Sequence, residues 1–169
     1  MREYAFLMVR YGMPDFAKDI QKDIPDDILY IDPDGSDNYG KEDDAHVTLA
    51  PCLDNDVDLE ELKKLLSPIR KYAGYITDIS KFECKDYDVL KCNVVSEPMS
   101  VTNKKILSKF ESHSEYKDSY HPHLTIAYLK KGQADRFCKR LKSFIKIEPT
   151  EFLFSYIDNG EEKSVAFEK

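Results

Sequence analysis

The heptapeptide PHLTIAY, residues 122–128, places a histidine and a threonine two positions apart in an apolar run. Side chains at positions i and i+2 of a β-strand point to the same face. His123 and Thr125 therefore stand side by side, while Leu124 and Ile126 face the opposite way. The stretch predicts a strand with one polar face and one buried face.

The chain carries a second copy of this pattern. The segment AHVTLAP, residues 45–51, sets His46 and Thr48 in the same order, with Val47 and Leu49 on the other face. Only four histidines are present in the whole chain, so half of them fall in matched His-x-Thr pairs. A single histidine on a strand is usually a hydrogen-bonded structural residue, whereas two matched copies indicate a shared function.

Two imidazoles that face one cleft provide acid–base chemistry near neutral pH. One ring accepts a proton from an attacking oxygen while the other donates a proton to the leaving oxygen. Each threonine hydroxyl can donate a hydrogen bond to a non-bridging phosphate oxygen. Zinc is the alternative, but zinc sites usually add a third strong ligand at recognisable spacing, and the sequence offers none. The pattern predicts metal-free phosphoester cleavage by the catalytic residues His46, Thr48, His123 and Thr125.

Length and composition limit the class of protein. The 169 residues, 41% of them hydrophobic, suit one domain spanning residues 1–169. No segment has the length and apolarity of a membrane span, and charges interrupt the amino-terminal segment, so we expect a cytoplasmic protein without a membrane partner. The four cysteines form no C-x-x-C pair, which is untypical of a zinc or redox site. We expect no cofactor and no obligate protein partner.

Net charge indicates the size of the ligand. The formal charge is −7, and binding to a long nucleic acid relies on many Lys and Arg side chains that neutralise successive phosphates. The composition therefore argues against long nucleic acid as a partner. A small anionic ligand in a local pocket is compatible with it.

Hydrophobic periodicity predicts a mixture of strands and helices without strict alternation. Strands are expected at residues 3–11, 27–31, 45–51, 75–85, 87–95 and 120–130, and a terminal hairpin at 151–169 that turns at Asn159-Gly160. Helices are expected at residues 14–24, 58–73, 100–112 and 134–145, the second shortened or kinked by Pro68. An acidic loop, residues 32–45, leads into the first His-x-Thr strand. This order favours an α+β fold with antiparallel sheets.

The motifs HVTL, residues 46–49, and HLTI, residues 123–126, resemble the paired signatures of the 2H phosphoesterase superfamily. Together with the strand–helix order over nearly the whole chain, the resemblance implies a bilobal α+β fold. Two antiparallel sheets are expected to form a central cleft with the helices packed outside. Each lobe is expected to present one His-x-Thr strand to this cleft.

A narrower resemblance covers the chain from about Tyr39 to Arg136. The segments YGKEDDAHVTL, FECKDYDVLKCNV and YHPHLTIAYLKKGQADRF are similar to the phage-encoded anti-CBASS phosphodiesterases. This implies a hydrolase that cuts the 3′–5′ bonds of cyclic di- or trinucleotide second messengers such as cGAMP and so blocks CBASS immunity in an infected bacterium. The alternatives are an RNA-end or ADP-ribose 2′,3′-cyclic phosphodiesterase of the same superfamily and a sponge that binds cyclic nucleotides without cutting them.

Aromatic and charged side chains are candidate ligands of a nucleotide substrate. Stacking contributes ~1–3 kcal/mol per base, and the aromatic candidates are Tyr11, Phe82, Tyr87, Tyr128 and Tyr156. If Phe152 and Phe154 face the core, Glu151 points the other way and becomes a candidate reader of a base edge. Candidate cations for phosphate are Lys91, Lys130 and Lys131. The other histidines, His113 and His121, are expected in solvated loops.

Overall fold

The computed structural model describes residues 3–33 and 39–169, so part of the predicted 32–45 loop lies outside the described residues. The strands are β1 Tyr4–Tyr11, β2 His46–Asp54, β3 Gly74–Glu83, β4 Tyr87–Val95, β5 His123–Lys130, β6 Lys139–Ile147, β7 Pro149–Asp158 and β8 Glu161–Phe167. The α-helices are α1 Asp15–Asp23, α2 Leu59–Lys64 and α3 Glu97–Lys109.

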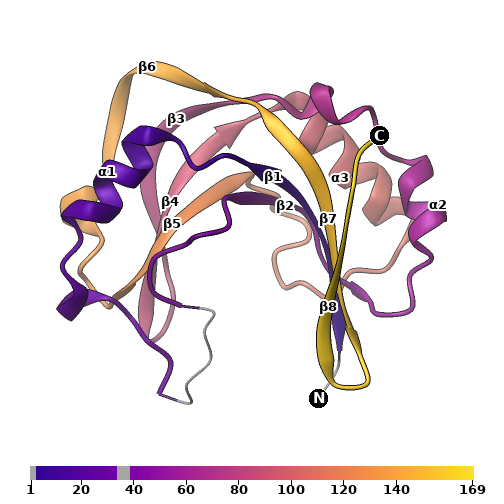
Figure 1. Cartoon of the computed structure of the whole chain (residues 1–169), viewed down its shortest axis with the longest axis horizontal. Coiled ribbons are helices and arrows are strands. Elements are labelled where there is room, and N and C mark those ends of the chain that lie inside the picture. The colour runs from indigo at the N-terminus through magenta and orange to yellow at the C-terminus, as the bar shows by residue number, and fades with distance from the viewer. Residues whose placement is uncertain (1–2, 34–38) are drawn as a thin grey trace.

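The strands form two antiparallel sheets of four strands each. The first sheet has the order β2-β1-β7-β8 and the second the order β5-β4-β3-β6. Figure 1 shows them as the two sides of an arch, with the helices on its outer surface. Each His-x-Thr strand ends its sheet order, and these two strands, β2 and β5, contact one another. The predicted α+β fold of two antiparallel sheets with outer helices is confirmed.

Two of the helices join strands of one sheet and pack against a strand of the other sheet. Helix α1 follows β1 of the first sheet and packs on β5 of the second, whereas α3 follows β4 of the second sheet and packs on β2 of the first. Each helix buries a narrow apolar stripe, Ala17 and Ile20 in α1 and Met99 and Ile106 in α3. The contacts of α1 with β5 and of α3 with β2 fix these two strands relative to each other.

Strand β1 shows how alternation separates the core from the site. Its residues alternate between partly exposed and buried, and the buried set is Ala5, Leu7, Val9 and Tyr11. The partly exposed Met8 and Arg10 pair in register with Thr48 and His46 of β2. Directly paired residues share a face of the sheet, so β1 presents Met8 and Arg10 beside the first His-x-Thr motif.

Tyr72 joins parts of the core that are far apart in sequence. It lies in a 3-10 helix, Ile69–Tyr72, and is fully buried. Its ring contacts Phe152 of β7 edge-on, and its hydroxyl lies 2.9 Å from Thr102 Oγ1 of α3 and accepts a hydrogen bond from the Ser67 backbone N–H at 3.0 Å. The Tyr11 hydroxyl donates to the Tyr72 carbonyl at 2.6 Å.

The predicted helix at residues 134–145 is wrong. A 3-10 helix, Asp135–Phe137, is followed directly by strand β6. Ile145 and Ile147 pair with Ile76 and Gly74 of β3. A free strand edge of the second sheet thus overrode the helical spacing of the apolar residues, because backbone pairing with β3 depends on a partner that local periodicity does not reveal.

Two other predicted elements differ in part. The strand predicted at 27–31 is instead a 3-10 helix, Asp26–Ile28, followed by a single bridge from Leu29 to Leu129 of β5. The helix predicted at 58–73 divides into α2 and the Ile69–Tyr72 3-10 helix, with Pro68 immediately before the second piece. Proline lacks the N–H that a continuous helix needs. The terminal hairpin is confirmed, with Asn159 and Gly160 at its turn.

Within residues 3–33 and 39–169, no helix has both the length and the apolar character that crossing a lipid bilayer requires.

We expect Tyr72→Phe to lower the free energy of unfolding by about 1–3 kcal/mol, because the partly buried N–H of Ser67 and the buried hydroxyl of Thr102 each lose a partner. Urea denaturation followed by circular dichroism measures the change. Tyr75→Phe is the matched control: Tyr75 is 48% exposed, so its change should stay within about 0.5 kcal/mol. Equal stability of the two variants would contradict the structural role of the Tyr72 hydroxyl.

Candidate active site

The two motif histidines are held by the same local contact. His46 Nδ1 lies 2.6 Å from the carbonyl oxygen of Asp44, and His123 Nδ1 lies 2.8 Å from the carbonyl oxygen of His121. A carbonyl can only accept, so Nδ1 is the donor in both rings. In the neutral form, each ring then has its lone pair on Nε2, the nitrogen left to exchange a proton with a ligand.

The fold brings the two motifs together from different sheets. Strands β2 and β5 contact each other, and His46 is near enough to His123 for its charge to affect the pKa of His123. Burial lowers the pKa of His123 below the ordinary value, and the charges of Lys91, His46 and His121 lower it further, against the raising effect of the hydrogen bond to the His121 carbonyl. His123 is therefore neutral at pH 7.

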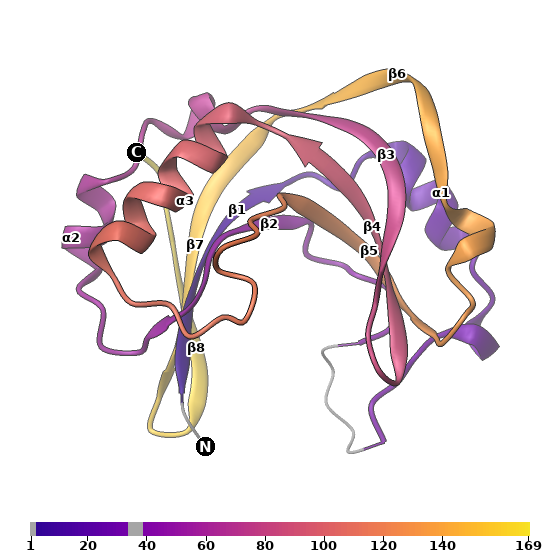
Figure 2. The same ribbon diagram turned by 180° about the vertical axis from the view of Figure 1, so that it is seen from behind.

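A pocket of about 430 Å³ opens between the sheets beside these motifs. Figure 2 shows the segment between α3 and β5 lying between the two sheets, and residues of this segment form one wall. The lining includes one member of each motif together with aromatic side chains: Thr48, His123, Phe82, Tyr116, Tyr120 and His121. A second hollow, of about 580 Å³ between α3 and residues 117–120, contains neither motif.

Lys91 lies next to the second motif. It pairs in register with Thr125 across the β4–β5 ladder and is buried. Its Nζ donates to Ser80 Oγ at 2.8 Å and to Asn93 Oδ1 at 2.5 Å. The ring of Phe82 lies 4.3 Å from this nitrogen and meets the ring of His123 edge-on. A buried cation thus stands beside the second histidine and threonine.

Arg10 occupies the corresponding place beside the first motif, where sequence reasoning did not identify it. It pairs in register with His46. Its guanidinium bonds Asp44 at 2.8 Å and Glu151 at 2.8 Å, and these carboxylates raise the pKa of Arg10. The Asp44 carbonyl holds His46, so Asp44 connects Arg10 to the histidine. The only local signal was the alternation of β1, which puts Arg10 on the same partly exposed face as Met8.

Glu151 and its neighbours lie as the alternation predicts. Phe152 and Phe154 are buried in the core, and Glu151 points to the opposite face of β7. Its carboxylate bonds Arg10, so this side chain is already engaged within the protein. Its role as a reader of a base edge stays a prediction.

The aromatic candidates separate into different environments. The prediction that Tyr11 stacks on a base of the substrate is wrong. Tyr11 is 5% exposed and its hydroxyl donates to the Tyr72 carbonyl, so its ring belongs to the core. Tyr156 stacks on Phe154 at the edge of the core. Phe82 lines the pocket beside His123.

Tyr128 and Tyr87 belong to a cluster of four tyrosines, of which the sequence analysis identified only these two. Their rings pack with those of Tyr30 and Tyr39, with centroid distances between 4.7 and 5.9 Å. Tyr128 lies on β5, three residues after Thr125. The cluster therefore adjoins the second motif, with its rings packed largely on one another.

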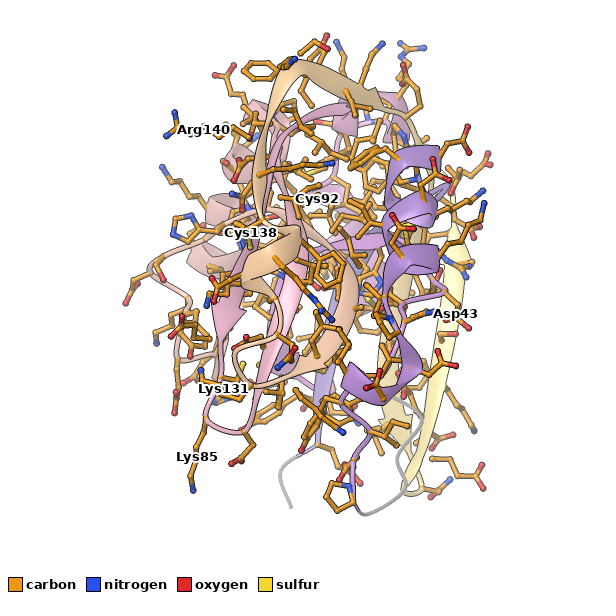
Figure 3. All side chains as sticks on the ribbon, turned by 90° about the vertical axis from the view of Figure 1, so that its left-hand side faces the viewer. Asp43, Lys85, Cys92, Lys131, Cys138 and Arg140 are labelled. Atoms are coloured by element: carbon orange, nitrogen blue, oxygen red, sulfur yellow. The ribbon has the colours of Figure 1, made fainter. Side chains whose placement is uncertain are left out.

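The other candidate lysines lie away from the motifs. Lys130 Nζ donates to the Asp27 carbonyl. Lys131 donates to the Cys84 carbonyl and faces the buried Asp88, with Nζ 3.4 Å from Oδ1. Figure 3 shows Lys131 on the outer side of the second sheet, near the turn that carries Lys85. Of the three lysines, Lys91 alone adjoins a His-x-Thr pair.

His113 is held more firmly than a solvated loop residue. Its Nε2 lies 2.7 Å from Asp54 Oδ1, its Nδ1 lies 4.0 Å from Glu111, and its ring stacks on Tyr4. Among the described residues these three ionisable groups form a cluster with metal-ligand types. The two carboxylates approach different ring nitrogens, Asp54 at hydrogen-bond distance and Glu111 at a longer ion-pair distance, which is unlike ligation of one ion. The cluster includes neither motif histidine.

Solved structures with the same fold cover nearly the whole chain. E. coli LigT in apo form has a TM-score of 0.55 at 14% identity, and LigT complexed with 3'-AMP has 0.53 at 14%, each covering 99% of this chain and 96% of that one. Kluyveromyces marxianus Usb1 has a TM-score of 0.52 at 12% identity and covers 98% of this chain and 99% of that one. At these identities the likeness shows the fold.

Sequence comparison identifies the family. No curated protein sequence matches the chain. The sequence profile of the 2'-5' RNA ligase superfamily matches residues 30–157, a range that contains both His-x-Thr strands. The chain therefore belongs to the 2'-5' RNA ligase superfamily, the group of the 2H phosphoesterases.

Proposed function

We propose that this phosphoesterase is a metal-independent phosphodiesterase that cuts the 3′–5′ bonds of cyclic di- or trinucleotides. The observation that carries the proposal is the meeting of β2 and β5, which puts two identically held imidazoles within electrostatic reach of one another. Paired imidazoles are suited to accept one proton and donate another in the same reaction.

The proposed reaction begins with the ribose 2′-hydroxyl. Its oxygen attacks phosphorus, the bond from phosphorus to the 5′-oxygen breaks, and a 2′,3′-cyclic phosphate forms. The hydroxyl proton passes to one histidine while the other protonates the 5′-oxygen. Water then opens the cyclic phosphate with the roles reversed. The hydroxyls of Thr48 and Thr125 hold the non-bridging oxygens as negative charge increases.

We assign the first proton acceptor to His123. Burial, together with the charges around it, lowers the pKa of His123, so its Nε2 lone pair is available at neutral pH. His46 is then the general acid that protonates the leaving oxygen. This assignment separates two histidines whose backbone contacts are the same.

Pocket size and charge support a small nucleotide as substrate. The pocket volume of about 430 Å³ and the aromatic side chains Phe82, Tyr116 and Tyr120 suit a ligand with bases, while the net charge of −7 disfavours a long polyanion. E. coli LigT, with the same fold, was solved complexed with 3'-AMP. The proposed biological role is the destruction of CBASS signals by a phage-encoded enzyme. It is supported by the resemblance of the segments around both motifs to the anti-CBASS phosphodiesterases.

A substrate panel tests the proposal against its alternatives. Purified protein is incubated with cyclic dinucleotides, cyclic trinucleotides, RNA ending in a 2′,3′-cyclic phosphate and a cyclic ADP-ribose phosphate, with and without excess EDTA. We expect linear product from the cyclic nucleotides at equal rates in both conditions. Turnover of the RNA end or of a cyclic ADP-ribose phosphate alone would favour the other phosphodiesterase class. Release of intact cyclic nucleotide from a stable complex would favour the sponge.

We expect His46→Ala and His123→Ala each to lower kcat on the preferred substrate by roughly 10²–10⁴-fold, because each removes one proton-transfer step. His113→Gln is the matched control, since His113 contacts Asp54 and lies outside the pocket; its rate should equal that of the parent. Parent-level turnover by either alanine variant would exclude paired acid–base catalysis.

The pH dependence tests the assignment of His123 as base. A base must be neutral, so kcat/KM should fall on the acid side as pH drops through the lowered pKa of His123, below the ordinary value of about 6.5. Initial rates at low substrate concentration across pH 4–9 measure this. If kcat/KM instead falls through a pKa at or above the ordinary histidine value, His123 is not the base and the assignment is wrong.

A further inference from the structure

Lys91 is a buried lysine whose immediate partners carry no charge. The residue is 4% exposed, and among the described residues its hydrogen-bond partners are Ser80 Oγ and Asn93 Oδ1. A lysine ammonium has three donors, so two are used and one is left. The nearby Asp78 is bonded to Asn93 Nδ2 at 2.6 Å, so Asn93 stands between its carboxylate and the ammonium.

Burying an ammonium in this way is costly unless an anion joins it. The pKa of Lys91 is below the ordinary lysine value, because loss of hydration on burial lowers it more than the negative charge of Asp78 raises it. The Phe82 ring, whose centroid lies 4.3 Å from Nζ, offers a cation–π contact that does not neutralise the charge. This environment holds a cation in place and leaves its charge largely uncompensated.

The position of Lys91 indicates which anion completes the site. Lys91 is the cross-strand partner of Thr125, and its charge is felt at His123. A phosphate held between the His123 imidazole and the Thr125 hydroxyl therefore lies next to the ammonium. Arg10, the cation beside His46, differs because two carboxylates already neutralise it.

We propose that Lys91 Nζ is the cationic ligand of the substrate phosphate at the His123–Thr125 pair. The inference rests on the proposed phosphodiesterase function and adds a binding residue outside both motifs. The third donor of the ammonium bonds a non-bridging phosphate oxygen, while Ser80 and Asn93 keep the side chain in place. Phe82 forms the apolar cover over this contact.

A bound phosphate then changes the proton affinity of His123. In the free protein the charge of Lys91 disfavours the imidazolium form of His123; an anion on Lys91 offsets that charge and raises the pKa of His123. Linkage is reciprocal, so protonation of His123 strengthens phosphate binding by the same factor. The ionisable groups around His123 are Lys91, His46 and His121 and, along the pocket, Glu83, Cys84, Tyr116 and Tyr120.

The test uses inorganic phosphate and NMR, and needs no turnover. The His123 signal, assigned with His123→Gln, is followed against pH in the parent and in Lys91→Met, Lys91→Arg and Lys81→Met. Lys81 is the matched control, because it lies on the adjacent strand and pairs with Glu83 and Asp135. We expect Lys91→Met to raise the pKa of His123 in the free protein and to weaken phosphate binding about 10- to 100-fold. In this variant, phosphate should no longer raise the pKa of His123 as it does in the parent. Lys91→Arg keeps the charge and should retain that rise, as should Lys81→Met.

A second measurement uses only the unaltered protein. Phosphate should shift the ¹⁵Nζ signal of Lys91 and leave that of Lys81 in place, which holds even if Lys91→Met does not fold. An unmoved Lys91 signal at saturating phosphate, or parent-like phosphate affinity in Lys91→Met, would overturn the proposal. Lack of turnover on every nucleotide would contradict the proposed function while these phosphate measurements still decide the role of Lys91.

Discussion

The contact between β2 and β5 is the constraint on which the site depends. The two strands belong to different sheets and lie at the ends of their strand orders, so their pairing partners alone do not bring them together. Helices α1 and α3, each packed on the sheet that it does not directly follow, fix this contact. Alternation along the two strands then points Leu49 and Leu124 into the core and leaves the histidines and threonines facing away from it.

The two motifs have the same backbone contacts and different electrostatic surroundings. Beside His46, the positive charge of Arg10 is matched by Asp44 and Glu151. Beside His123, the ammonium of Lys91 contacts neutral groups. The charge of Lys91 adds to the effect of burial in lowering the pKa of His123, so the second motif carries an uncompensated positive neighbour that the first motif lacks.

Sequence patterns were sufficient where the evidence was local. The alternation around both His-x-Thr pairs, the Asn159-Gly160 turn and the helix break at Pro68 each depend on neighbouring residues. They failed where a distant partner decides. The apolar spacing after Gly132 fits a helix, but the open edge of β3 made this segment a strand. Tyr11 lies two residues after Val9, on the same buried face of β1. Its aromatic ring suggested a stacking role, although the alternation of the strand already placed it in the core. Arg10 and Glu151 meet across 141 residues, so no local pattern reveals their ion pair.

The first sheet also determines when the molecule can assemble. Its middle strands, β1 and β7, come from opposite ends of the chain and pair along their length, with Leu7 opposite Phe154. Contacts between residues so distant in sequence slow folding, because the loop between them must close before the pairing stabilises it. During synthesis β1 and β2 must wait for β7, with apolar strand surface uncovered until then. The arrangement of strands that holds the candidate site is therefore complete only after β7 has left the ribosome.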